Sequence, residues 1–215
     1  MAQDDKNSER VSLNPFKWLA VLQIELTRID HHVELSSRNA CLSLTALELM
    51  TIVLEDRRFF RHCGVDVLSV VREMYRALTF QRHGGASTIE MQFVRTATGF
   101  RQHTIWRKLC ETLLAIVVSR RYHKIVILRA YMACAFFGSG LVGADAAARK
   151  VFGREASRLT LEEAAVIAAM LARPRPLGGS ASWDARARRR AAYGLRVYGA
   201  SNRRLTIPFD IVLNA

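Results

Sequence analysis

The chain has 215 residues, half of them hydrophobic, which is enough to bury the core of one domain without disulfides or a structural metal. Its formal net charge of +13 favours a polyanionic partner: a nucleic acid, an anionic membrane surface or a phosphorylated substrate. No uninterrupted run of about 18 apolar residues is present and the N-terminus is acidic, so we expect neither a transmembrane helix nor a secretory signal.

The first predicted elements are a polar tail over residues 1–13 and an amphipathic helix over 15–35. The apolar side of that helix carries Phe16, Trp18, Leu19, Leu22 and Leu26. Thr45 and Glu48 then have the spacing of a capping box, which predicts the start of a second helix. We expect that helix to end at Gly64.

Helical spacing continues through the rest of the chain, with a helix that begins at Ser87 or Thr88 after a glycine-containing loop. Thr160 and Glu163 form a second predicted capping box. The other predicted helices cover 65–80, 104–122, 124–138, 160–173 and 183–199. No internal repeat and no long alternating pattern is present, so the expected fold class is a single, mainly α domain.

The predicted helix over 104–122 has one apolar and one charged face. The apolar face carries Ile105, Leu109, Thr112, Leu113 and Ile116. Arg107, Lys108 and Glu111 fall together on the other side. A solvated, salt-bridged face explains this trio most simply, but a glutamate placed before its lysine would support the helix better. A functional role for the trio is therefore the alternative.

The stretch EDRRFFRHCGVD holds more reactive groups than a fold requires. Glu55 and Asp56 follow an apolar helix, where carboxylates oppose the helix dipole. Phe59 and Phe60 supply apolar cover, which can raise the proton affinity of a carboxylate and make it a usable base. His62 is placed to orient a carboxylate or to donate to the backbone. The stretch is a candidate catalytic segment, although an acidic pair followed by aromatics is common.

The segment HGGASTIEMQFVR combines glycines, two hydroxyls, an amide and a cation. Backbone N–H groups at a helix start, with Arg95 nearby, are suited to holding a phosphate. A glycine pair followed by Ser87 and Thr88 is by itself a weak signal. The order of the segments along the chain is more specific.

Five segments in order resemble the sequence boxes of glycosyltransferase family 51, the peptidoglycan glycosyltransferases. They are EDRRFFRHCGVD, GGASTIEMQ, WRKLCE, KIVILRAYM and LTLEEAAVIAAMLARP. The resemblance implies an α-helical, lysozyme-like fold with a cleft between two lobes. We therefore expect the glycosyltransferase domain over 36–200, preceded by the polar tail and amphipathic helix over 1–35 and followed by a C-terminal tail over 201–215.

The family reaction joins lipid II to a growing lipid-linked glycan, with inversion and with release of polyprenyl pyrophosphate. By resemblance, Glu55 is the general base, and Glu111 assists near the leaving pyrophosphate or its divalent cation, Mg²⁺ or Mn²⁺. No organic cofactor is implied. Arg107 and Lys108 would neutralise the diphosphate. The other positions expected to bind or orient substrate are Asp56, Phe59, His62, Ser87, Thr88, Gln92 and Arg95.

The chain departs from the family pattern at three positions. Glu90 and Met91 replace a hydroxyl and an amide in the second box, and Ala133 replaces an asparagine in the fourth. These changes motivate an alternative, a catalytically impaired member that binds lipid II or glycan and modulates cell-wall synthesis. No Ser-x-x-Lys transpeptidase box is present, so a monofunctional enzyme is expected.

The resemblance also sets expectations for partners and location. The expected partners are lipid II, the lipid-linked glycan strand, an anionic membrane surface and other cell-wall synthesis proteins. The expected location is the outer, periplasmic face of the cytoplasmic membrane. The basic stretch ARARRRAAYGLR prompts a third hypothesis, a helical nucleic-acid binder. No known nucleic-acid-binding module accompanies it, so nucleic acid is not an expected partner.

Overall fold

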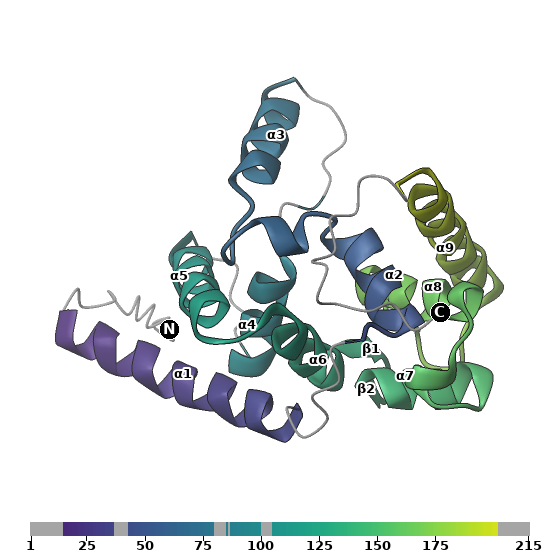
Figure 1. Cartoon of the computed structure of the whole chain (residues 1–215), viewed down its shortest axis with the longest axis horizontal. Helices are drawn as coiled ribbons and strands as arrows, with labels where there is room; N and C mark the ends of the chain where they lie inside the picture. Colours follow the sequence, from purple (N-terminus) through teal and green to yellow (C-terminus); the bar gives the residue numbers. More distant parts are fainter. Residues whose placement is uncertain (1–14, 37–42, 80–84, 86, 100–104, 202–215) are drawn as a thin grey trace, which may run out of the picture.

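The computed structural model describes residues 15–36, 43–79, 85, 87–99 and 105–201 (Figure 1). In this part of the chain the helices are α1 (Pro15–Ser36), α2 (Ala46–Glu55), α3 (Val67–Leu78), α4 (Ile89–Thr98), α5 (Ile105–Arg121), α6 (Lys124–Cys134), α7 (Ala144–Phe152), α8 (Leu161–Ala172) and α9 (Ala181–Ser201). Strands β1 (Phe136–Gly138) and β2 (Leu141–Val142) form a short antiparallel pair. The prediction of a mainly α, lysozyme-like domain is confirmed. The predicted polar tail over 1–13 and all but the first residue of the predicted C-terminal tail over 201–215 lie outside the described residues.

The predicted helix starts at Thr45, Thr88 and Thr160 are confirmed. Thr45 accepts a hydrogen bond from the backbone N–H of Glu48, whose carboxylate accepts from the N–H of Thr45 in turn. Thr160 and Glu163 form the same reciprocal pair at the start of α8. Each cap satisfies backbone donors that have no partner within the helix.

The helices pack in two groups (Figure 1). One group contains α2, α8 and α9, and the other contains α1, α4, α5 and α6. Within the first group, a Cβ on Gly194 of α9 would lie 2.9 Å from side-chain atoms of Met50 and Leu54 on α2. The missing side chain therefore allows α9 to approach α2 closely, next to the end of α2 that carries Glu55.

The structure ends α2 at Glu55, well before the predicted end at Gly64. Asp56 leaves the helical conformation (φ −153°, ψ 79°), because its carboxylate accepts from the N–H of Ile89 at the start of α4. Gly64 has a different role: its φ is +86°, and an added Cβ would lie 2.3 Å from the carbonyl oxygen of Ala115 on α5. A glycine is required there because the chain passes directly against α5.

The helix predicted over 124–138 also ends early, at Cys134. Ala135 is extended, and Phe136–Gly138 forms β1. The carbonyl of Phe137 accepts a hydrogen bond of 2.8 Å from the N–H of Arg175. A long-range backbone pairing therefore replaces the last helical turn, and the local sequence does not encode it.

The orientation predicted for α5 is wrong. Leu109 and Leu113, expected in the core, are exposed, whereas the carboxylate-bearing Glu111 is buried. The buried side of the helix instead carries Cys110, Leu114, Ala115 and Val118. Both sides of α5 have apolar residues at helical spacing, so the pattern alone does not decide which side packs against the neighbouring helices.

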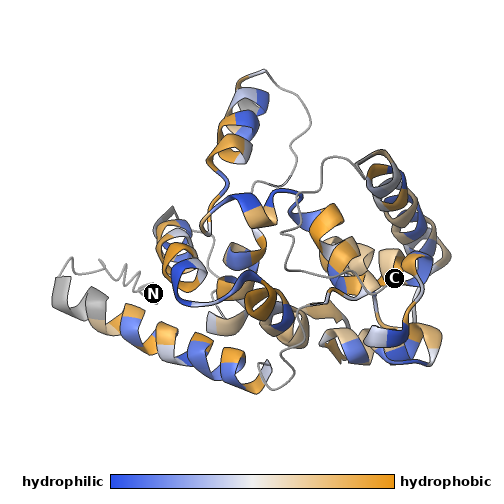
Figure 2. Cartoon of the chain, in the orientation of Figure 1, coloured by the Kyte–Doolittle hydropathy of each residue, from blue (hydrophilic) through white to orange (hydrophobic). Residues whose placement is uncertain are grey.

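Helix α3 projects from the two helix groups (Figure 1). Figure 2 shows that it carries both hydrophobic and hydrophilic residues. Its exposed apolar side chains, which we call the α3 apolar face, are Val67, Leu68, Val71, Met74, Tyr75 and Leu78. Their spacing of three, four and seven residues places them on one side of the helix. The described part of the chain covers none of these six side chains.

Helix α1 packs against the core through Ile29 and Val33, with Leu22 partly buried beside them. Val21 and Ile24 are exposed. The side chains of Phe16, Trp18 and Leu19 lie outside the described residues. Among the residues described, no helix combines the length and the apolar character needed to span a bilayer.

Candidate active site

A cavity of about 710 Å³ lies where the end of α2, the start of α4 and the side of α9 meet. Polar residues of α3 form another part of its wall, so α3 turns one side to the cavity and the α3 apolar face to the outside. Arginines outnumber carboxylates in the lining, which contains Arg57, Arg58, Arg61, Arg72, Arg76, Arg95 and Arg190 against Glu55, Asp56, Asp66 and Glu73. The electrostatics of the cavity therefore favour an anionic ligand.

Glu55, the last residue of α2, lies in the wall of this cavity. One carboxylate oxygen accepts a hydrogen bond of 2.8 Å from the guanidinium of Arg190 on α9. The other accepts from the side-chain amide of Gln92 on α4 at 3.2 Å. Arg190 also donates to the carbonyl of Leu54, which has no helical partner at the end of α2. Elements from both helix groups thus fix one carboxylate at the edge of the cavity.

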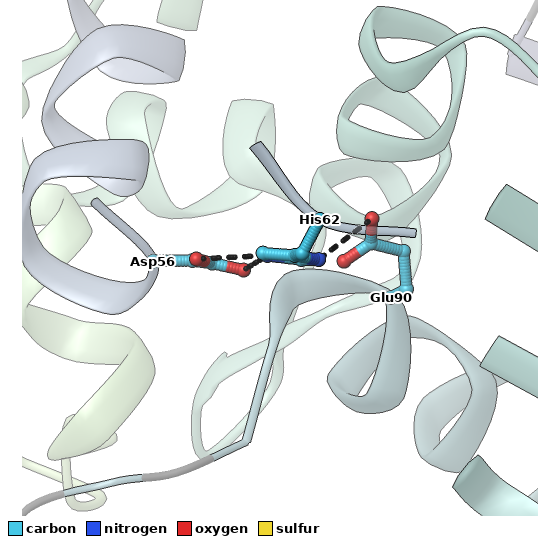
Figure 3. A group of neighbouring side chains, drawn as sticks. All are labelled: Asp56, His62 and Glu90. Atoms are coloured by element: carbon cyan, nitrogen blue, oxygen red, sulfur yellow. Dashed lines mark hydrogen bonds and ion pairs between the residues drawn. The ribbon is translucent and has the colours of Figure 1, made fainter. Parts of the chain in front are cut away.

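Asp56 and His62 form a pair of buried side chains (Figure 3). The His62 Nε2 atom lies 2.9 Å from the Asp56 carboxylate, which also accepts from the N–H of Ile89 at 3.2 Å. The expectation that His62 orients a carboxylate therefore agrees with the geometry. Asp56 links the segment that follows Glu55 to α4.

Glu90 is fully buried and does not line the cavity. Its carboxylate is paired with Lys124 at the start of α6, and it lies 4.0 Å from the other ring nitrogen of His62 (Figure 3). Burial raises the pKa of Glu90, and the charge of Lys124 and its hydrogen bond oppose that rise. The Lys124 ammonium also lies 4.8 Å from the centre of the Phe59 ring. The departure at Glu90 thus places no charge in the cavity.

Asp56, His62 and Glu90 have ligand atoms close enough together to raise the question of a divalent cation. The arrangement does not fit one. The two carboxylates face opposite nitrogens of the imidazole ring, so one ion cannot contact both carboxylates and the ring. In addition, the Lys124 ammonium already neutralises Glu90. This cluster is better described as a buried hydrogen-bonded array than as a metal site.

The start of α4 forms the cavity wall opposite α9. Thr88 caps α4 by accepting from the N–H of Met91, and its hydroxyl donates to the Gly64 carbonyl at 2.6 Å. Ser87 precedes it, and its hydroxyl accepts a hydrogen bond of 3.1 Å from Lys108 on α5. The cap therefore ties the Gly64 turn to α4 and leaves Ser87 in the cavity wall.

Glu111 is buried behind this wall and does not line the cavity. Arg107 donates to one of its carboxylate oxygens at 2.6 Å, and the Lys108 ammonium lies 3.9 Å from the other. Burial lowers the pKa of Lys108, Glu111 opposes this, and the charges of Arg95 and Arg107 add to it. Glu111 therefore holds the side chains of Arg107 and Lys108, and Lys108 reaches Ser87 in the cavity wall.

Comparisons with known proteins agree with this geometry. A family model described as Transglycosylase matches residues 39–197. The chain belongs to the transglycosylase family. It is 38% identical to penicillin-binding protein 1A of Aquifex aeolicus over 122 residues, 55% of this chain and 16% of that protein. It is 37% identical to penicillin-binding protein 2a of Streptococcus pneumoniae over 128 residues, 60% of this chain and 17% of that protein.

A shorter relative is a Cupriavidus necator protein that is named as a transglycosylase. It is 37% identical over 145 residues, 67% of this chain and 62% of that protein. The chain spans about a sixth of the length of the two penicillin-binding proteins. The transglycosylase match starts and ends within the predicted domain over 36–200.

The residues expected from the transglycosylase boxes fall into two sets. Those in the cavity lining are Glu55, Asp56, Ser87, Thr88, Gln92 and Arg95. Those outside the lining are Phe59, His62, Arg107, Lys108 and Glu111. The second set contacts the first through the Asp56–His62 pair and the Ser87–Lys108 hydrogen bond.

Three residues that contact this transglycosylase site were not predicted. Arg190 lies within the basic stretch of α9, which the sequence analysis considered only for nucleic-acid binding. Tyr131 and Lys124 lie within the fourth box, but nothing in its spacing indicates their partners Gln92 and Glu90. For Tyr131 and Lys124, the available signal was a polar residue within the otherwise apolar helix α6, because such residues are buried only with a partner.

Proposed function

We propose that this chain is a monofunctional peptidoglycan glycosyltransferase that polymerises lipid II. The observation that carries the proposal is the position of Glu55, a fixed carboxylate in the wall of an arginine-rich cavity of a transglycosylase-family protein. Relatives named penicillin-binding protein 1A and transglycosylase support the substrate class, a lipid-linked glycan.

In the proposed reaction the acceptor sugar hydroxyl attacks the anomeric carbon of the donor. The bond from that carbon to the diphosphate oxygen breaks as the new glycosidic bond forms, and the diphosphate leaves with the bonding electrons. Glu55 accepts the proton of the attacking hydroxyl. The configuration inverts because attack and departure occur on opposite faces of the sugar.

The cavity arginines meet the negative charge that develops on the departing diphosphate. Arg95 and the Ser87 hydroxyl lie in the wall formed by α4. Glu111 acts indirectly, since it holds Lys108 against Ser87. Donors that are fixed before the reaction stabilise such charge without reorganisation during it.

An anionic membrane surface at the outer face of the cytoplasmic membrane is the proposed location. Support comes from the α3 apolar face, which is exposed although the other side of α3 lines the cavity. A second exposed apolar row lies on α5, at Trp106, Leu109, Leu113 and Val117. An amphipathic helix of this kind binds the bilayer interface without spanning it. The diphosphate of a lipid-linked substrate would then reach the cavity while its chain stays in the bilayer.

The test is incubation of the purified protein with labelled lipid II, detergent and a divalent cation. Lysozyme-sensitive polymer is the expected product. Glu55→Gln should lower its rate about 10²- to 10⁴-fold, the usual contribution of a general base. Glu48→Gln is a matched control, because Glu48 lies at the opposite end of α2 and pairs with Arg129 outside the cavity. Normal polymerisation by Glu55→Gln would refute the assignment.

The alternative function, a binding module without catalysis, has less support than the sequence suggested. One of its three motives was the charge of Glu90, and Glu90 is paired with Lys124 outside the cavity. Binding of lipid II with no polymer, in wild type and in Glu55→Gln alike, would establish that alternative.

A further inference from the structure

The two oxygens of the Glu55 carboxylate have different partners. Arg190 contacts one through a charged guanidinium that also donates to the Leu54 carbonyl. Gln92 contacts the other through a neutral amide at 3.2 Å. A neutral primary amide can present either its NH₂ group or its oxygen to a neighbour. The orientation of the Gln92 amide therefore decides whether the proposed base is stabilised or repelled.

The Glu55 carboxylate, which can only accept, selects the NH₂ group, and Tyr131 on α6 holds the amide in that orientation. Its hydroxyl donates a hydrogen bond of 2.7 Å to the amide oxygen of Gln92. With the oxygen held by Tyr131, the NH₂ group is directed at Glu55. The reverse orientation would place the amide oxygen against a carboxylate oxygen, two acceptors without a proton between them.

Tyr131 is suited to donate and not to bind substrate. The side chain is buried and is absent from the cavity lining, whereas Gln92 is half-buried and lines the cavity. Burial, and then the nearby charge of Glu55, raise the pKa of the Tyr131 phenol above its usual value. The phenol therefore keeps its proton and remains a donor throughout the pH range in which proteins are stable.

We propose that Tyr131 is a positioning residue, which orients the Gln92 amide and through it the carboxylate of Glu55. We call the contacts from Tyr131 through Gln92 to Glu55 the relay. The relay rests on the proposed function, because Glu55 is the base only if the chain is a glycosyltransferase. Without the Tyr131 hydroxyl, the Gln92 oxygen loses its partner and the side chain turns towards the water of the cavity. Glu55 then retains Arg190 alone and swings away from the attacking hydroxyl.

The kinetic test compares Tyr131→Phe, Gln92→Met and the double variant with wild type in lipid II polymerisation. Since a misplacement of about 1 Å can cost 10²-fold, the Tyr131→Phe change should lower kcat about tenfold while KM changes less than about twofold. In the Gln92→Met background the same change should have no further effect. Equal kcat for Tyr131→Phe and wild type, or independent effects of the two changes, would overturn the relay.

Tyr122→Phe is the matched control. The Tyr122 hydroxyl also donates to a side-chain oxygen, that of Asp30, but it joins α5 to α1 away from the cavity. The control should lower the melting temperature and leave kcat unchanged. If it lowers kcat as much as Tyr131→Phe does, the effect is a general loss of packing and the relay is refuted.

A second measurement does not depend on activity. The losses of melting temperature for Tyr131→Phe and Gln92→Met should be non-additive, because both remove the same hydrogen bond. Those for Tyr122→Phe and Gln92→Met should add. If wild type makes no polymer, the proposed function fails, and this comparison still decides whether the relay exists. Additive losses for the first pair would refute it.

Discussion

At the scale of single residues, the Glu90–Lys124 pair shows how the chain accommodates a buried charge. Burial disfavours the Glu90 carboxylate, and Lys124, the nearby His62 ring and a backbone hydrogen bond oppose this effect. The two side chains therefore form one unit, and replacing either alone should be worse than replacing both.

Glu90→Thr alone should destabilise the protein by about 3 kcal/mol, because it leaves the partly buried Lys124 ammonium without its carboxylate. Glu90→Thr with Lys124→Met should recover most of this loss, since the methionine chain can pack on the Phe59 ring. Urea unfolding of the three proteins measures the difference. Equal stability of the single and double variants would show that the pair is not coupled.

The Glu90–Lys124 pair also predicts that the free energy of unfolding depends on pH. Because the pKa of Glu90 is raised in the folded state, the folded protein binds this proton more tightly than the unfolded chain. The contribution of Glu90 to the free energy of unfolding is therefore largest at pH values below the ordinary pKa of glutamate. It falls as the pH rises through the raised pKa of Glu90. Urea unfolding at several pH values above about 4 should show this fall in wild type, and the Glu90→Gln/Lys124→Met variant should lack it.

At the scale of elements, the turn between α2 and α3 depends on one glycine. Gly64 has a positive φ and lies against the backbone of α5, whereas Gly153 has a positive φ with open space around it. The two positions separate the cost of the backbone conformation from the cost of a clash.

Gly153→Ala should cost about 1 kcal/mol, the ordinary penalty of a left-handed non-glycine residue. Gly64→Ala should cost clearly more, because its Cβ would displace α5 from the segment that follows Glu55. Thermal unfolding of both variants provides the comparison. Equal losses would mean that the contact with Ala115 is not required.

The exposed side chains of the α3 apolar face predict that this helix binds a membrane surface. Val71→Asp with Met74→Ser should weaken binding to anionic liposomes and leave the fold intact, because both side chains are exposed. Leu177→Asp, a change at a more exposed apolar residue in the loop before α9, is the control. Cosedimentation with anionic and neutral liposomes measures the effect. Equal loss for control and test variants would argue against α3 as the contact.

At the scale of the whole molecule, the two helix groups build a positively charged cavity that neither forms alone. Arg190 comes from one group and Arg95 from the other, and both face the same space. Part of the net charge of +13 lies in this cavity, because its seven lining arginines exceed its four carboxylates.

Arg95→Gln should raise KM for lipid II about tenfold, since a hydrogen bond to a charged group contributes about 1.5 kcal/mol or more. Arg186→Gln removes an exposed charge of α9 that does not line the cavity, and it should leave KM unchanged. Steady-state kinetics at two salt concentrations distinguish a specific contact from the overall field, which salt screens. An equal rise for both variants would assign the effect to net charge.

Features that depend on neighbours a few residues away could be predicted from the amino-acid sequence. The caps at Thr45, Thr88 and Thr160, the starts of their helices and the order of the transglycosylase boxes are local patterns, so they are legible in the chain. Glu55 could be predicted as the general base because its box is contiguous. The early end of α2 could not be predicted, because the hydrogen bond from Ile89 to Asp56 at this end joins residues 33 positions apart.

Contacts between distant segments are visible only in the folded protein. Arg190 lies 135 residues from Glu55, and Tyr131 lies 39 residues from Gln92. The burial of Glu111 and the exposure of the α3 apolar face likewise depend on which helices pack together. Such contacts form when the hydrophobic faces of both helix groups are buried, and local propensity does not contain that information.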